Sequence, residues 1–570
     1  MNNPVKSIKN TRKIIDPVFW FLAVWLVINI IQAYFTELAH DEAYYWMYSK
    51  YLALGYYDHP PFIALIIRVG YLIFHNELGV RLITCILGTG TLFLLYKLVN
   101  SHGRNLSFFI MLTMSIGLVS THIGGFIAIP DTPLIFFTAL FYYLYKKYLE
   151  KDNIITAVLI SFVIALMLYS KYHGILVLFF TFISNLNLAR RKSFWIIILL
   201  SAALMVPHLL WQINNNFPTL EYHIIGRSSH YKPGFTINYI YSQLLIAGPL
   251  TGIIILYHAF TFKNKNYFEK ALKFNLAGTF IFFFISSFKG HVEPHWTAIA
   301  FIPLIILSYK SIIDAKKAKI WIQRLFWPSV VMFLFVRVLL MYELLPGSWN
   351  ILTEFHGWDK WADEIKKTAD GRKVVFTNKY QYPSKYTFYT GDFSFTLNNI
   401  YYRKNQYDLW NFEDSVQNKS VILMHSKTPT DTLITSNGLV YDYQFINNFK
   451  SYYRVKINLK TDKRVFSKGE YVNMAMLIEN KSDKIIDFRD SNNRKSYMCY
   501  TYAYRDKYLF LPKRINNITL NCINPYSSYC QNIKIRAPEK PGKYTLYISI
   551  VTGILKPANN SNPVKIKVSE

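Results

Sequence analysis

The chain has 570 residues, of which 52% are hydrophobic and only 17% are charged. Globular proteins average about a quarter charged residues, so this deficit excludes a disordered, fibrous or wholly soluble protein. The net charge of +29 would suit nucleic-acid binding, and the positions of the charges are the better test of that class. The apolar residues crowd into 18–342, and the rest of the chain has the composition of a soluble protein.

Long apolar runs repeat along this first part of the chain. Most reach or approach the roughly 17–25 residues that a helix needs to cross a bilayer. The run at 61–75 is shorter and contains Arg68, so we predict a helix that lies in the membrane interface there. The sequence predicts an α-helical polytopic membrane domain over 1–345 with about 11–13 transmembrane helices. The clearest spans lie near 18–36, 79–99, 105–124, 132–148, 154–170, 173–188, 194–212, 236–260, 272–288, 295–309 and 320–341.

Lys and Arg in short loops mark the cytoplasmic side of a membrane protein. When alternate loops are counted from the N-terminus, 21 of the 29 Lys and Arg residues before 343 fall on one side. Membrane topology therefore explains much of the positive charge, and nucleic acid is not expected as a partner. Eight of the 13 acidic residues in the same stretch fall on or near the opposite face. Because carboxylates at a membrane boundary are costly, we expect the chemistry on that outer face.

The first outer loop combines acids with many aromatic residues. Asp41 and Glu42 begin an expected helix rich in tyrosine, and acids in a first turn also suit the helix dipole. The dipole does not explain Tyr57, Asp58 and His59, which follow in the same loop. We therefore predict that this loop contributes to an active site.

The second outer loop places Asp131 between Pro130 and Pro133, at the mouth of the next span. Aspartate is a good helix N-cap, so a capping role stays open beside that of a second active-site carboxylate.

Basic residues gather on the same face. Lys171 and Lys289 end two spans, where snorkelling anchors are the alternative reading, and Arg227 lies in a longer loop. Cations that converge on a face holding two carboxylates suit a substrate that carries a phosphate. Glu293 and His295 follow Lys289 and are expected to line the same pocket.

Taken in order, these motifs resemble the GT-C polytopic glycosyltransferases, in the branch of the bacterial aminoarabinose (lipid A) transferases and the protein O-mannosyltransferases. The likeness covers roughly 15–412 and rests on the order and the sidedness of the motifs together. The segments that carry it are Asp41-Glu42, Tyr57-Asp58-His59-Pro60, Asn76-Glu77-Leu78-Gly79-Val80-Arg81, Pro130-Asp131-Thr132-Pro133, Ser170-Lys171-Tyr172, Glu293-Pro294-His295-Trp296, Phe388-Tyr389-Thr390-Gly391 and Asn405-Gln406-Tyr407-Asp408-Leu409-Trp410.

The resemblance implies an enzyme of the bacterial inner membrane that moves a sugar from a polyprenyl-phosphate carrier to an envelope glycolipid, polysaccharide or protein on the periplasmic face. Asp41, beside Glu42, would be the general base or orient the acceptor, and Asp131 would be the second acidic site residue. Lys171 and Arg227 would hold the lipid phosphate.

The aminoarabinose branch has an acidic-Lys-Pro pattern where this chain has Asp58-His59-Pro60, so a phosphate role does not carry over to His59. Some relatives bind a metal near this loop. The cofactor is therefore open, and Asp58 with His223 or His230 would be candidate ligands for a divalent metal.

Two other classes of function stay open. A polytopic carrier or flippase for a lipid or sugar would also hold charges in its membrane domain, although such proteins often show internal repeats and none is visible here. A structural membrane anchor for the C-terminal part is the third class, and it leaves the acidic loops unexplained.

The soluble part divides into two patterns. Over 346–452 an amphipathic helix alternates with short apolar strands, which predicts a small outer α/β unit. Over 453–570 the apolar residues alternate with period two, as in Val472–Ile478, which predicts a β-sandwich. Of the three cysteines in this last stretch, Cys522 and Cys530 are the expected disulfide pair.

Overall fold

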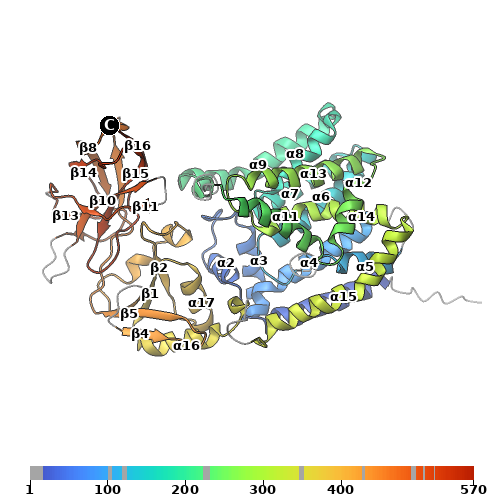
Figure 1. The fold of residues 1–570 in the computed structure, drawn as a ribbon, viewed down its shortest axis with the longest axis horizontal. Coiled ribbons are helices and arrows are strands. Elements are labelled where there is room, and N and C mark those ends of the chain that lie inside the picture. Colours follow the sequence, from blue (N-terminus) through green and yellow to red (C-terminus); the bar gives the residue numbers. More distant parts are fainter. Residues whose placement is uncertain are drawn as a thin grey trace, which may run out of the picture. The chain divides into compact units, whose positions relative to one another are not determined.

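The computed structural model describes residues 17–99, 105–117, 125–222, 231–345, 352–425, 431–461, 463–488, 496–504, 508–518 and 520–570. Internal contacts divide the chain into two compact units, Met1–His356 and Gly357–Glu570 (Figure 1). The first is helical and the second is rich in strands.

The helical unit follows from the long apolar runs of the sequence. Figure 1 shows its helices packed side by side, with a long α15 along one edge. Its elements, with 3₁₀ helices labelled η, are α1 (Pro17–Phe35), α2 (His40–Lys50), α3 (Phe62–Tyr71), α4 (Glu77–Val99), α5 (Leu106–Met114), α6 (Asp131–Glu150), α7 (Ile154–Ser170), α8 (Gly174–Ser184), η2 (Leu186–Arg190), α9 (Lys192–Asn214), α10 (Pro218–Leu220), α11 (Pro233–Ala247), α12 (Gly252–Thr261), α13 (Tyr267–Ser286), η4 (Pro294–Ala300), α14 (Phe301–Ile312), α15 (Lys316–Met341) and η6 (Thr353–Phe355).

Each predicted span coincides with a helix, part of a helix or a helix pair, and the polytopic helical fold is confirmed. Among the described residues, five helical segments are long and apolar enough to cross a membrane, and α11 with α12 makes a sixth if that pair, bent by 95°, counts as one span. This is fewer than the 11–13 helices predicted. Part of the reason is length, since α7 and α8 have only 17 and 11 residues.

The segment predicted to lie in the interface forms α3, which has only 10 residues and is therefore too short to cross a bilayer. It buries Ile63 and Ile67 on one face and exposes Arg68 on the other. Gly70 lets α3 approach α4 closely, because a Cβ there would lie 2.2 Å from the carbonyl oxygen of Gly79.

The two ends of α6 carry different chemistry. Asp131 is its first residue and pairs with Lys171 at the end of α7. Near its other end, the backbone oxygen of Tyr148 accepts a hydrogen bond from Arg191, in a loop that the sequence predicts to be cytoplasmic. At 1.5 Å per residue the 20 residues of α6 span about 30 Å, so the acidic loops and this basic loop lie a bilayer thickness apart.

The second unit begins with an amphipathic helix, α16 (Trp358–Ala369), which buries Trp361 and Ile365. With α17 (Gln381–Thr390) it accompanies a five-stranded sheet of order β2-β1-β3-β5-β4, in which β1, β2 and β3 are parallel. The strands are β1 (Lys373–Thr377), β2 (Phe395–Leu397), β3 (Val421–His425), β4 (Asp431–Ile434) and β5 (Val440–Ile446), with short η7 (Gln406–Asp408) and η8 (Phe412–Ser415) between β2 and β3.

The last part of the chain is built of β-strands around one apolar core. The largest sheet runs β11-β10-β15-β16-β7, and a smaller one runs β14-β8-β6. Along β8 the buried residues alternate with less buried ones, as predicted. The strands are β6 (Lys456–Lys460), β7 (Val465–Ser467), β8 (Tyr471–Glu479), β9 (Ile486–Asp487), β10 (Tyr497–Tyr504), β11 (Tyr508–Leu509), β12 (Lys513–Arg514), β13 (Cys522–Ile523), β14 (Ser528–Arg536), β15 (Gly542–Val551) and β16 (Val564–Ser569).

The predicted disulfide is wrong for this structure, in which all four cysteines are free. Cys522 lies on β13, which pairs only with β9, and Cys530 lies on β14, which pairs with β8. The two residues therefore belong to different sheets.

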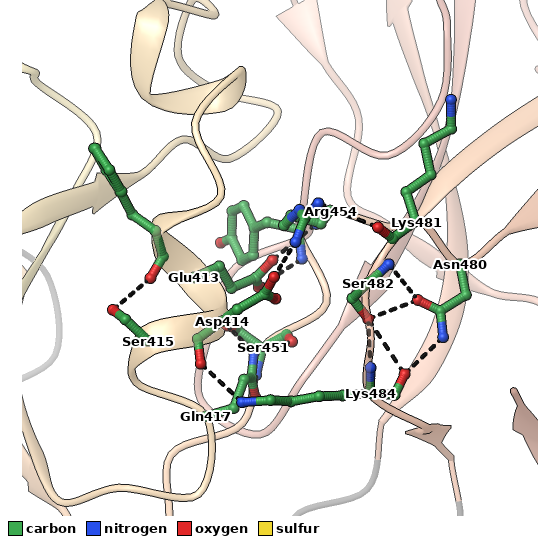
Figure 2. Close-up of polar contacts among 12 residues, drawn as sticks. Glu413, Asp414, Ser415, Gln417, Ser451, Arg454, Asn480, Lys481, Ser482 and Lys484 are labelled. Carbon is green, nitrogen blue, oxygen red and sulfur yellow. Dashed lines mark hydrogen bonds and ion pairs between the residues drawn. The ribbon is translucent and has the colours of Figure 1, made fainter. Parts of the chain in front are cut away.

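A polar cluster joins η8 to the strands of the last part (Figure 2). The buried Glu413 carboxylate accepts hydrogen bonds from the backbone amides of Tyr453 and Arg454, each at 2.9 Å. Arg454 forms an ion pair with Asp414, and Lys484 Nζ donates to the Asp414 carbonyl oxygen at 2.8 Å. These hydrogen bonds and the ion pair link η8 to the last part of the chain within the second unit.

Candidate active site

Glu42, predicted to be catalytic, is fully buried and held by Arg81 of α4. Arg81 Nε and Nη2 donate to the two carboxylate oxygens at 2.7 and 2.5 Å. The same guanidinium donates to the backbone oxygens of Ala33, Thr36 and Glu37. Such a bidentate pair in a dry interior fixes geometry, so Arg81 ties the end of α1 and the start of α2 to α4.

Glu42 also binds the backbone of the loop before α6. Its Oε1 accepts the backbone amide of Ala128 at 2.7 Å, and its Oε2 accepts that of Ala39 at 2.9 Å in a capping arrangement. Ala128 lies three residues before Asp131. Glu42 therefore connects the turn that carries Asp41 to the segment that carries Asp131, and its catalytic role stays a prediction.

Asp41 itself lies in the first turn of α2 and is exposed. The preceding residue, His40, is fixed through its backbone amide, which donates to Glu354 Oε1 at 2.7 Å. The turn that carries this exposed carboxylate is therefore held at His40 and at Glu42.

Asp58 lies within a group of tyrosines from α2 and the loop that follows it. Tyr44 and Tyr48 donate to its Oδ2 at 2.8 and 3.2 Å, and Tyr48 stacks on Tyr56 with ring centroids 4.0 Å apart. Burial raises the pKa of Tyr48, which keeps its hydroxyl protonated as a donor. On either side of Asp58, Tyr57 packs near Tyr222 and His59 meets the edge of Tyr45.

Asp131 and Lys171 form the second buried ion pair at this end of the unit. Lys171 Nζ lies 2.8 Å from both carboxylate oxygens, and the two side chains are 5% and 4% exposed. His295 of η4 approaches Asp131 with Nε2 at 3.8 Å. The capping alternative for Asp131 is not what its side chain shows here, since its oxygens are taken by the ammonium group. Lys171, predicted to bind phosphate, has a carboxylate partner and keeps one further donor.

The remaining predicted residues are less well connected. Glu293 precedes η4 and lies 3.5 Å from His291, and Lys289 is exposed. Arg227, His223 and His230 lie outside the described residues, so their predicted roles are not addressed. Within the ranges that the structure describes, no three His, Cys, Asp or Glu side chains gather as a metal site would require.

A hydrogen-bonded chain that sequence reasoning missed lies next to Lys171. Tyr172 Oη is 2.5 Å from His208 Nε2 of α9, and His208 Nδ1 is 2.6 Å from the Leu54 carbonyl oxygen. Gln212 Nε2 donates to Tyr172 Oη at 2.9 Å and to Thr219 Oγ1 at 2.8 Å. The only signal in the sequence was the presence of His208 and Gln212, four residues apart, in an apolar run.

Comparison with known proteins gives this arrangement a context. The family model of the dolichyl-phosphate-mannose-protein mannosyltransferases matches residues 58–211. The structure of ArnT from Cupriavidus metallidurans in the apo state is similar to this chain with a TM-score of 0.56 and 14% identity, over 75% of this chain and 97% of that one. The search of curated protein sequences gives no match.

Two further structures are more distant. An oligosaccharyltransferase from Archaeoglobus fulgidus in the apo form aligns with a TM-score of 0.41 and 13% identity, over 66% of this chain and 64% of that one. The arabinosyltransferase EmbB from Mycobacterium smegmatis aligns with a TM-score of 0.38 and 9% identity, over 98% of this chain and 64% of that one. These scores are too low to support an inference.

The predicted resemblance is confirmed: the chain has a GT-C-like fold similar to that of ArnT, and residues 58–211 match the mannosyltransferase model. With several apolar helices, these findings support a multi-pass membrane glycosyltransferase.

Proposed function

We propose that this protein transfers a sugar from a polyprenyl-phosphate carrier to an envelope acceptor on the periplasmic face of a bacterial inner membrane. The observation that carries the proposal is the bond from the Ala128 amide to Glu42, which draws the turn of Asp41 toward the loop of Asp131. Two predicted site carboxylates and the Lys171 ammonium thereby belong to one end of the helical unit. The match to the mannosyltransferase model supports the same chemistry.

Asp41 is the proposed base. An acceptor hydroxyl or amine loses its proton to Asp41 as its oxygen or nitrogen forms a bond to the anomeric carbon of the sugar. The bond from that carbon to the phosphate oxygen breaks, and the electron pair leaves with the phosphate. A positioned base contributes about 100- to 10,000-fold to such a step.

The leaving phosphate is already anionic, so it needs fixed cations more than a proton donor. Lys171 offers its remaining N–H for this purpose while Asp131 holds its side chain in place. Lys289 and Arg227 are the further proposed phosphate ligands, and Tyr57, Asp58, His59, Glu293 and His295 are proposed to line the pocket.

The orientation of the chain belongs to the same proposal. The basic loops would face the cytosol, and the second unit would be periplasmic. Cysteine labelling at an exposed loop residue near Asp41, from either side of intact cells, would test this placement.

The decisive experiment compares envelope glycolipids and glycoproteins by mass spectrometry in cells with the wild-type chain, with Asp41→Asn and without the gene. The exposed Asp314→Asn between α14 and α15 is the matched control. We expect one hexose or pentose increment to disappear in the deletion and in Asp41→Asn, and to persist in Asp314→Asn. An increment that persists in Asp41→Asn refutes the role of Asp41, and envelopes that are identical with and without the gene refute the proposed function.

A further inference from the structure

The loop from 51 to 59 is held to α9 by contacts that the proposed reaction does not use. A Cβ on Gly55 would lie 2.4 Å from the Trp211 ring, so the backbone of the loop rests directly on that side chain. Thr219 Oγ1 donates to the Tyr56 carbonyl oxygen at 3.1 Å, and His208 binds the carbonyl oxygen of Leu54. Two carbonyls on either side of Gly55 are therefore fixed by the α9–α10 region.

The direction of each hydrogen bond in this chain follows from its ends. The Leu54 carbonyl oxygen can only accept, so His208 Nδ1 donates to it. In the neutral imidazole with its proton on Nδ1, Nε2 accepts the hydroxyl proton of Tyr172. Tyr172 Oη in turn accepts from Gln212 Nε2. A continuous chain of hydrogen bonds therefore runs from Gln212 and Tyr172 through His208 to the loop.

The two ends of this chain lie beside proposed site residues. Tyr172 directly follows Lys171, whose backbone amide ends α7 through a bond to the Met167 carbonyl oxygen. Leu54 and Tyr56 precede Tyr57 and Asp58, which are proposed pocket residues. A displacement of α9 would thus be transmitted to the loop on one side and to the lysine on the other.

We propose that Tyr172, His208 and Gln212 form a latch that positions the loop from 54 to 59 relative to Lys171, and that this latch sets the affinity for the polyprenyl phosphate donor. The inference rests on the proposed function for the identity of the donor. The three side chains act through other residues and are positioning residues.

The test uses the full chain in detergent and a polyprenyl monophosphate as the probe. His208→Phe keeps the ring volume and removes both hydrogen bonds, whereas His208→Gln offers one donor and one acceptor at a similar spacing. We expect the dissociation constant to rise about tenfold in His208→Phe and somewhat less in Tyr172→Phe, as for the loss of one or two hydrogen bonds, and to return close to wild type in His208→Gln. His258→Phe in α12 is the matched control, since His258 bonds to Ser311 of α14, at 2.9 Å, and not to the loop from 51 to 59.

A second measurement tests the attachment of the loop independently of the identity of the donor. Hydrogen exchange of peptides covering 51–59 should become faster in His208→Phe and not in His258→Phe. Unchanged exchange, or equal affinities in all variants that bind, overturns the latch. A wild-type protein that does not bind the probe, with exchange still faster in His208→Phe, overturns the proposed donor and leaves the loop attachment established.

A double-mutant cycle identifies the route of the effect. If the latch acts through the geometry around Lys171, then Lys171→Met and His208→Phe change the affinity less together than the sum of their separate effects. Additive effects would show that the latch does not act on Lys171.

Discussion

Two buried carboxylates stand at the same end of the helical unit and have opposite surroundings. Glu42 is enclosed by Arg81 and two backbone amides, and neither member of the ion pair is exposed. Asp131 pairs with Lys171, with 4% and 5% of the two side chains exposed, and His295 Nε2 lies 3.8 Å away. Glu42 binds two backbone amides besides its cation and so holds the two loops together, whereas Asp131 holds the lysine that is proposed to bind the substrate phosphate.

The largest effect should come from breaking the enclosed pair. Glu42→Gln leaves the Arg81 charge buried without its partner, which costs about 3–5 kcal/mol of folding free energy. We expect a sharp fall in the yield and in the melting temperature of the purified protein, measured by fluorescence. A variant that folds with wild-type stability and loses only transfer would support the catalytic role that the sequence predicts for Glu42. Glu42 and Asp131 would then not differ in the way described above.

Asp131→Asn should lower the transfer activity more than the stability of the protein, the opposite of what we expect for Glu42→Gln. Transfer should fall by about 100-fold or more, because the orientation of Lys171 toward the phosphate is lost. The loss of stability should be smaller than in Glu42→Gln, since Glu42 also holds two backbone amides. In Asp131→Asn with Lys171→Met we expect stability to recover without activity. Recovered activity in the double variant would mean that the pair is structural, like Glu42 and Arg81.

The ion pair between Asp414 and Arg454 sharpens the comparison from the second unit. Both side chains are partly exposed, at 26% and 20%. Partly exposed pairs contribute about 0–1 kcal/mol, so Asp414→Asn should lower the melting temperature by only a few degrees. A loss as large as that of Glu42→Gln would show that the polar cluster in Figure 2 carries the stability of the unit.

The smallest effect is a pH dependence. Burial raises the pKa of the Glu413 carboxyl above its ordinary value, so the folded state binds this proton more tightly than the unfolded state. The contribution of Glu413 to stability is therefore present below the unfolded pKa and is lost as pH rises through the folded pKa. Melting of the wild type and of Glu413→Gln across this range should show a difference that grows on acidification in favour of the wild type. Parallel curves would contradict the assignment.

Local patterns in the sequence were sufficient for the helices, the alternating strands and the acidic loops. They could not show that the Glu42 carboxylate forms a buried ion pair, because its partner Arg81 lies 39 residues away on another helix. The contact between Tyr172 and His208 was equally hidden, since a single histidine inside an apolar run gives no sequence pattern from which its partner could be predicted. The pairing of Asp131 with Lys171 was likewise invisible, although both residues were singled out separately.

The break between α11 and α12 has a consequence for how the chain enters a membrane. Thr251 Oγ1 at this break donates to the Ser115 carbonyl oxygen just after α5, at 2.9 Å. Non-helical backbone is tolerated at membrane depth only where protein shields it from lipid. The bent pair therefore depends on a segment synthesised more than a hundred residues earlier, and it reaches its final shape only after that segment is in place. A substitution that disturbs the chain just after α5 is accordingly expected to disturb the bend between α11 and α12 as well.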